Sequence, residues 1–146
     1  MYSFCGIDFY NMLDGTSDGF ELLNVFDEVL QEHRADGSAV LKQGDSVVMD
    51  NCGFHHGHRI EPVFQDMLAD CSVRLLLQPP YSPHFNTCEY CFNKIKAFLR
   101  RHQMLAVNET KIAIAQAMLN ITANSLYAYF KHCGYFLRAI LFLPFL

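Results

Sequence analysis

One short proline-rich run constrains this chain more than any other feature of its sequence. The run reads Pro79-Pro80-Tyr81-Ser82-Pro83. It can be neither a helix interior nor a central strand, because proline lacks the backbone N–H group that both structures use. An apolar run, Val73–Leu77, precedes it, and a helical pattern that begins at Asn86 follows it. The sequence therefore predicts a strand, a loop and a helix in direct succession.

Short apolar runs alternate with helical patterns along most of the chain. Strands are expected where β-branched and aliphatic residues cluster, and helices where apolar residues recur three and four positions apart. The expected strands are Ser3–Leu13, Ser46–Asp50 and Val73–Leu77, the last two buried. The expected helices are Phe20–Leu30 (capped by Ser17 or Asp18), Ile60–Leu68, Asn86–Arg101, Asn108–Leu119 and Ala123–His132. This order predicts an α/β fold.

Composition narrows the class of protein. With 51% apolar residues, 13 Phe and 7 Tyr, the chain can bury a core and is not a disordered segment. Its formal net charge of −4 argues against attachment to DNA by bulk positive charge, yet it agrees with a nuclease core that gathers carboxylates. No signal peptide opens the chain, so we expect an intracellular protein with reduced cysteines. The apolar tail Phe136–Leu146 is too short to span a membrane, and we interpret it as a packing segment or a non-native end.

Two carboxylates occupy positions from which they could meet. Asp50 ends an apolar strand, and Glu89 lies early in the helix that follows the next strand and loop. In open α/β sheets, active groups gather at the carboxyl ends of strands. Taken alone, Asp50 could be a turn residue, and Glu89 could complete a capping box with Asn86. Their joint occurrence with the proline-tyrosine run favours a shared site.

These residues resemble a known family. An Asp50-Asn51 pair at a strand end with His55 shortly after it, followed by the proline-tyrosine run, Asn86 and Glu89, resembles the mariner-like branch of the DDE superfamily of transposases. The best-matched region is 47–101, and residues 103–146 form a C-terminal helical extension. We treat residues 1–146 as one partial DDE catalytic domain.

The resemblance implies a fold, a chemistry and partners. The fold would be a partial ribonuclease H-like domain, with a mixed sheet flanked by helices and followed by C-terminal helices. Asp50 and Glu89 would be the second and third catalytic carboxylates and would bind Mg²⁺ or Mn²⁺, of which the complete site of the family holds two ions. The reaction would be DNA cleavage and strand transfer on double-stranded transposon ends and target, by a nuclear protein that could form a homodimer. Asn51, His55, Tyr81, Ser82 and Asn86 would support the site.

The sequence also departs from the family. The Asn-Pro of the family is Asn86-Thr87 here, and the acidic residue often found after Tyr-Ser-Pro is His84. No residue before Asp50 fills the role of the first catalytic Asp, since Asp8 lies in a segment that resembles a later strand. We therefore expect an N-terminally truncated domain whose catalysis is impaired.

Other clusters leave alternatives open. Lys94, Lys96, Arg100 and Arg101 could contact DNA phosphates or form an ordinary solvated helix face. Cys88 and Cys91, aided by Cys52, His55, His56 or His58, could bind a structural zinc ion, although no second Cys-x-x-Cys is present. The alternatives to an impaired nuclease are thus a non-catalytic domain that binds nucleic acid or protein, and a zinc-stabilised interaction module.

Overall fold

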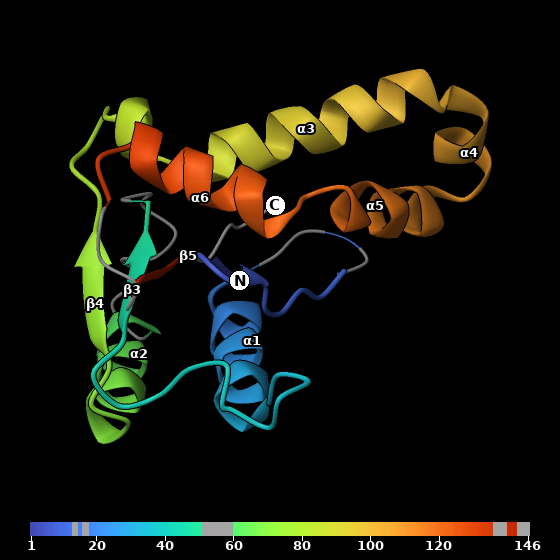
Figure 1. The fold of residues 1–146 in the computed structure, drawn as a ribbon. Helices are drawn as coiled ribbons and strands as arrows, with labels where there is room; N and C mark the ends of the chain where they lie inside the picture. The colour runs from blue at the N-terminus through green and yellow to red at the C-terminus, as the bar shows by residue number, and fades with distance from the viewer. Residues whose placement is uncertain (13–14, 16–17, 51–59, 136–139, 143–146) are drawn as a thin grey trace.

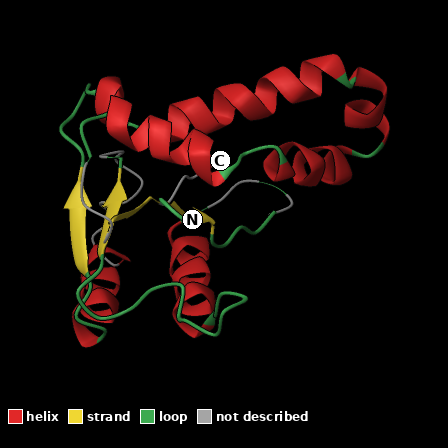
Figure 2. Cartoon of the chain, in the orientation of Figure 1, coloured by secondary structure: helices red, strands yellow, loops and turns green. Residues whose placement is uncertain are grey.

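The computed structural model describes residues 1–12, 15, 18–50, 60–135 and 140–142. Its strands are β1 (Tyr2–Ser3), β2 (Gly6–Ile7), β3 (Ser46–Met49), β4 (Arg74–Leu77) and β5 (Ile140–Phe142). Its helices are α1 (Gly19–Gln31), α2 (Ile60–Asp70), the 3-10 helix η2 (Pro83–Phe85), α3 (Cys88–Arg101), α4 (Gln103–Asn108), α5 (Thr110–Leu119) and α6 (Ala123–His132). The expected α/β class is confirmed (Figure 2).

The five strands form one mixed sheet in the order β2-β1-β5-β3-β4. β3 runs parallel to both β4 and β5, whereas β1 is antiparallel to β5 and to β2. β3 therefore lies between two parallel neighbours. The end of β3, where Asp50 follows, is the edge at which α/β sheets gather functional groups.

Helices cover the sheet on both faces (Figure 1). Val47 and Met49 pack in a core with α1 and α2, while Val48 points into a second core with α3 and α6. This division follows from the strand, whose successive side chains point to opposite faces. Beyond this layer, α4 and α5 fold back along α3.

Asp18 caps the start of α1, and Gly134 follows the end of α6. The Asp18 carboxylate accepts hydrogen bonds from the backbone N–H groups of Phe20 (2.9 Å) and Glu21 (3.0 Å), so the expected cap of α1 is confirmed. Helix α6 ends two residues before Gly134, which adopts a φ of 82°, a conformation that costs glycine little.

Two expectations about strands were wrong. Ser3–Leu13 is not one strand: the chain reverses after Ser3, whose hydroxyl accepts from the Cys5 N–H (3.2 Å), and β2 then pairs with β1. β4 is not buried, because it lies at the sheet edge with Leu76 46% and Leu77 39% exposed. In the described part of the tail, Leu141 packs in the core, and β5 in addition pairs inside the sheet, which was not expected.

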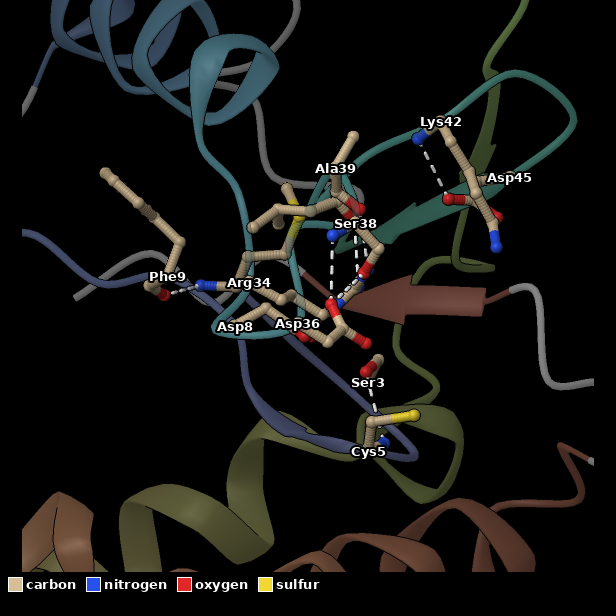
Figure 3. Close-up of polar contacts among 12 residues, drawn as sticks. Ser3, Cys5, Asp8, Phe9, Arg34, Asp36, Ser38, Ala39, Lys42 and Asp45 are labelled. Carbon is tan, nitrogen blue, oxygen red and sulfur yellow. Dashed lines mark hydrogen bonds and ion pairs between the residues drawn. The ribbon is translucent and has the colours of Figure 1, made fainter.

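A polar cluster fixes the start of the chain (Figure 3). The Arg34 guanidinium pairs with the Asp8 carboxylate (2.6 Å) and donates to the carbonyls of Ala39 (2.6 Å) and Val40 (2.8 Å). The Met1 amino group donates to the Phe9 carbonyl. The ion pair of Asp8 with Arg34 thus joins the first hairpin to the loop after α1.

No helix in the described ranges is both long enough and apolar enough to cross a membrane.

Candidate active site

Asp50 is positioned by a fully buried strand. All four residues of β3 are buried, while Asp50, directly after them, is exposed. The Met49 carbonyl accepts a hydrogen bond from the Gln78 N–H (2.9 Å), which joins the end of β3 to the residue after β4. The exposed carboxylate therefore follows directly on a buried, hydrogen-bonded strand.

The loop between β4 and α3 is anchored at both ends. The buried Gln78 side chain donates to the Phe85 carbonyl (2.7 Å) and to the Tyr135 hydroxyl (3.4 Å). Within the loop, the Ser82 hydroxyl donates to the Pro80 carbonyl (3.3 Å), and Pro83–Phe85 form a turn of 3-10 helix. The predicted loop is confirmed, and its internal hydrogen bonds give it a defined shape.

Glu89 lies exposed in the first turn of α3. The Asn86 side chain accepts from the Cys88 N–H (3.0 Å), which satisfies one of the free donors at the start of the helix. In a capping box, the Asn86 N–H would donate to the Glu89 side chain. Here it donates to the Pro83 carbonyl instead (3.0 Å). The Glu89 carboxylate thus stands at the positive end of the helix dipole.

The end of β3 and the start of α3 approach one another. Burial raises the pKa of the Cys88 thiol to about 12, and the charge of the Asp50 carboxylate is one of the smaller causes of that rise. Val48 of β3 and Cys88 of α3 pack in the same core, so Asp50 and Glu89 follow residues that lie near one another. The fold therefore brings the segments that carry both predicted carboxylates to one end of the sheet.

The same end of α3 is tied to the first strand. The Tyr2 hydroxyl hydrogen-bonds the buried Thr87 hydroxyl (2.5 Å) and donates to Cys88 Sγ (3.3 Å). Sequence reasoning missed this contact, because nothing local signals an interaction between residues 85 positions apart. Tyr2 and Thr87 hold the helix that presents Glu89.

Several predicted residues lie outside the described part of the chain. These are Asn51, Cys52, His55, His56 and His58. Within the described ranges, no three His, Cys, Asp or Glu side chains group closely enough to hold a metal ion. The strand beside β3 that could have carried a further carboxylate is β5, whose sequence, Ile140-Leu141-Phe142, offers none.

The two cysteines of the Cys-x-x-Cys motif lie in the core. Cys88 and Cys91 are buried against Tyr2 and α6. Burial raises the pKa of Cys91 to about 11, as it raises that of Cys88, so both thiols keep their protons near neutral pH. Both side chains therefore contribute to the packing between α3, the first strand and α6.

The basic residues of α3 differ in their surroundings. The half-buried Lys94 donates through Nζ to the Ser125 hydroxyl (2.8 Å), which joins α3 to α6. Lys96, Arg100 and Arg101 are exposed toward the end of the helix. Only these three of the four are presented to solvent.

This architecture, an α/β sheet with carboxylates at a strand end and a helix start, is typical of a metal-dependent nuclease core. A family model described as DDE superfamily endonuclease matches residues 6–111, a range that contains both carboxylates and the loop between them. The chain therefore belongs to the DDE superfamily of endonucleases. No curated protein and no solved structure matches it.

Proposed function

We propose that this chain is part of the catalytic domain of a mariner-like transposase, with a partial ribonuclease H-like fold. Asp50 and Glu89 bind a divalent cation, Mg²⁺ or Mn²⁺, and the substrate is double-stranded DNA in the nucleus. The observation that carries this proposal is that Val48, two residues before Asp50, packs in one core with Cys88, the residue before Glu89. Membership of the DDE superfamily supports it, since these enzymes generally depend on divalent metal and act on DNA.

The donor set fits one hard cation. Carboxylate oxygens are the ligands that Mg²⁺ and Mn²⁺ prefer, and Mg²⁺ is commonly held by one or two carboxylates with water completing its shell. Asp50 and Glu89 are both exposed, so water can reach them. The described residues supply no third carboxylate beside them.

The carboxylates and the basic residues have different roles in such a site. When bound, a divalent cation activates an attacking water or 3′-hydroxyl and stabilises the leaving oxygen. Asp50 and Glu89 hold and orient that cation, and their negative charges repel the phosphate backbone until the cation offsets them. Lys96, Arg100 and Arg101 contact phosphates and fix the position of the duplex without reading its sequence.

We infer that catalysis is impaired in this chain, because the described residues bring no third carboxylate beside Asp50 and Glu89. The sheet position beside β3 is filled by the apolar β5, which offers no ligand for a second ion. Robust Mg²⁺-dependent cleavage of duplex DNA by the 146-residue chain, lost in Asp50→Ala, would contradict this inference.

Metal binding tests the site itself. Titration of Mn²⁺, followed by calorimetry, should show binding that weakens about tenfold or more in Asp50→Asn and in Glu89→Gln, because each change removes one charged ligand. Asp66→Asn on the exposed face of α2 is the matched control and should leave binding unchanged. Equal affinity in all four proteins would overturn the assignment.

A second candidate function, DNA binding without cleavage, is favoured because the described residues supply no third carboxylate. A domain that keeps the exposed Lys96, Arg100 and Arg101 but lacks a complete set of carboxylates can bind DNA without cutting it. Binding of duplex DNA that weakens with salt, without cleavage, would support this function.

A further inference from the structure

Tyr81 is the most unusual residue of the loop between the two carboxylates. Its side chain is fully exposed to solvent, and its backbone adopts a φ of 56°. Left-handed backbone in a bulky residue other than glycine is strained and needs a reason. Packing cannot be that reason, because the ring is fully exposed.

Hydrogen bonds and prolines restrain the loop backbone that carries the ring. Gln78 anchors the loop through the Phe85 carbonyl, and Asn86 joins its far end to the first turn of α3. Pro80 and Pro83 stand close on either side and restrict the backbone. An exposed aromatic ring on a restrained loop loses little conformational freedom when it binds a flat partner.

The loop presents more than one ring. His84 and Phe85 contact each other with ring centroids 4.2 Å apart, and Phe85 is 38% exposed. Aromatic rings at a surface that tracks nucleic acid are stacking partners for bases, because every base has a π-face. Bases within a duplex already stack on their neighbours, so a protein ring can reach only a base that has left the stack.

The loop that carries Tyr81 lies between the segments that carry the two carboxylates. The Gln78 N–H binds the Met49 carbonyl, next to Asp50, and the loop ends at the helix start that carries Glu89. We propose that Tyr81 stacks on an unpaired base of the DNA held at this site. This inference rests on the proposed function, because it requires DNA at the carboxylates, but it assigns a separate role in recognising distorted DNA.

The test measures binding rather than cleavage. The probes are a DNA duplex with one unpaired 2-aminopurine in a bulge and the same duplex with 2-aminopurine fully paired. The wild-type chain should bind the bulged duplex about tenfold more tightly and quench its fluorescence, since stacking on a ring quenches this base. Tyr81→Ala should abolish both the preference and the quenching.

Matched variants separate stacking from structure. Tyr81→Phe retains the ring and should retain the preference, whereas alanine has the same Cβ as tyrosine and so leaves the backbone strain unchanged. Tyr127→Ala removes a ring that is 58% exposed on α6 and should behave like the wild type. Far-ultraviolet circular dichroism confirms that each variant folds.

The outcomes distinguish the two proposals. If the wild type binds both duplexes equally, or if Tyr81→Ala keeps the preference, the role of Tyr81 is overturned while DNA binding stands. If the wild type binds neither duplex, the proposed function and the role of Tyr81 fall together.

Discussion

At the scale of single residues, the α-amino group of Met1 lies in a buried environment that disfavours its charged form. Met1 is buried, and its amino group donates to the Phe9 carbonyl. Burial lowers the pKa of this amine from 8.0 to about 6, and the negative charge of the Asp8 carboxylate opposes part of that shift. The folded chain therefore binds this proton more weakly than the unfolded chain does.

The lowered pKa predicts how stability depends on pH. Between pH 6 and pH 8 the unfolded state holds more protons on this amine, so the free energy of unfolding should rise with pH, by about 3 kcal/mol across the interval. The effect is complete above pH 8. Urea denaturation of the chain with a free amino terminus at pH 6, 7 and 8 measures it.

Acetylation of the amino terminus is the control. It removes the titrating group, so the slope contributed by Met1 should vanish whatever else the acetyl group does to stability. An unfolding free energy that stays flat or falls from pH 6 to pH 8 in the free chain would contradict the assignment.

Some of the residues at the candidate site could be predicted from the sequence, and others could not. Asp50 and Glu89 could be selected because each has a recognisable local setting, a strand end and a helix start. The Tyr2 contact with Thr87 and Cys88 has no local setting, since it exists only when the first strand packs on α3. Such pairings are set by tertiary structure, which no short window of sequence contains.

At the scale of elements, β5 joins the two parts of the sheet. It pairs with β1 on one side and β3 on the other, and Leu141 is only 2% exposed. Leu141→Ala should lower the free energy of unfolding by about 2–5 kcal/mol, because it opens a cavity in the core. Urea denaturation measures the loss.

Leu76→Ala is the matched control on the edge strand β4. The Leu76 side chain is 46% exposed, so its truncation removes less buried surface and should cost less than about 1 kcal/mol. Equal losses in the two variants would mean that β5 does not pack as the sheet topology requires.

The elements differ in how far the sequence predicted them. All five expected helices formed, four of them with a shifted end and α6 with the expected bounds, because amphipathic spacing and capping are local signals. α4 was not expected as a separate helix. The tail was not expected to be a strand, because its pairing partners, β1 and β3, lie far away in the sequence.

At the scale of the whole molecule, charge is divided unevenly. The chain carries a net charge of −4, yet Lys96, Arg100 and Arg101 are exposed together toward the end of α3. If these three residues contact phosphates, replacing all three by alanine should reduce the slope of log affinity against log salt by about 2–3. Duplex binding measured by anisotropy over a range of salt concentrations gives the slope.

Arg74→Ala provides the comparison, since Arg74 is exposed on β4, away from α3. It should leave the slope unchanged. A triple variant with the slope of the wild type would show that these residues form an ordinary solvated helix face.

The pairing of Tyr2 with Phe142 has a consequence for how the molecule is made. These partners lie at opposite ends of the described chain, so the sheet cannot close until Phe142 has left the ribosome. Until then β1 and β3 have no partner between them, and their open edges can pair with strands of other chains. Long-range pairing of this kind also slows folding. Slow translation of the segment that precedes β5 would prolong this vulnerable interval, and chaperones that cover strand edges would shorten it.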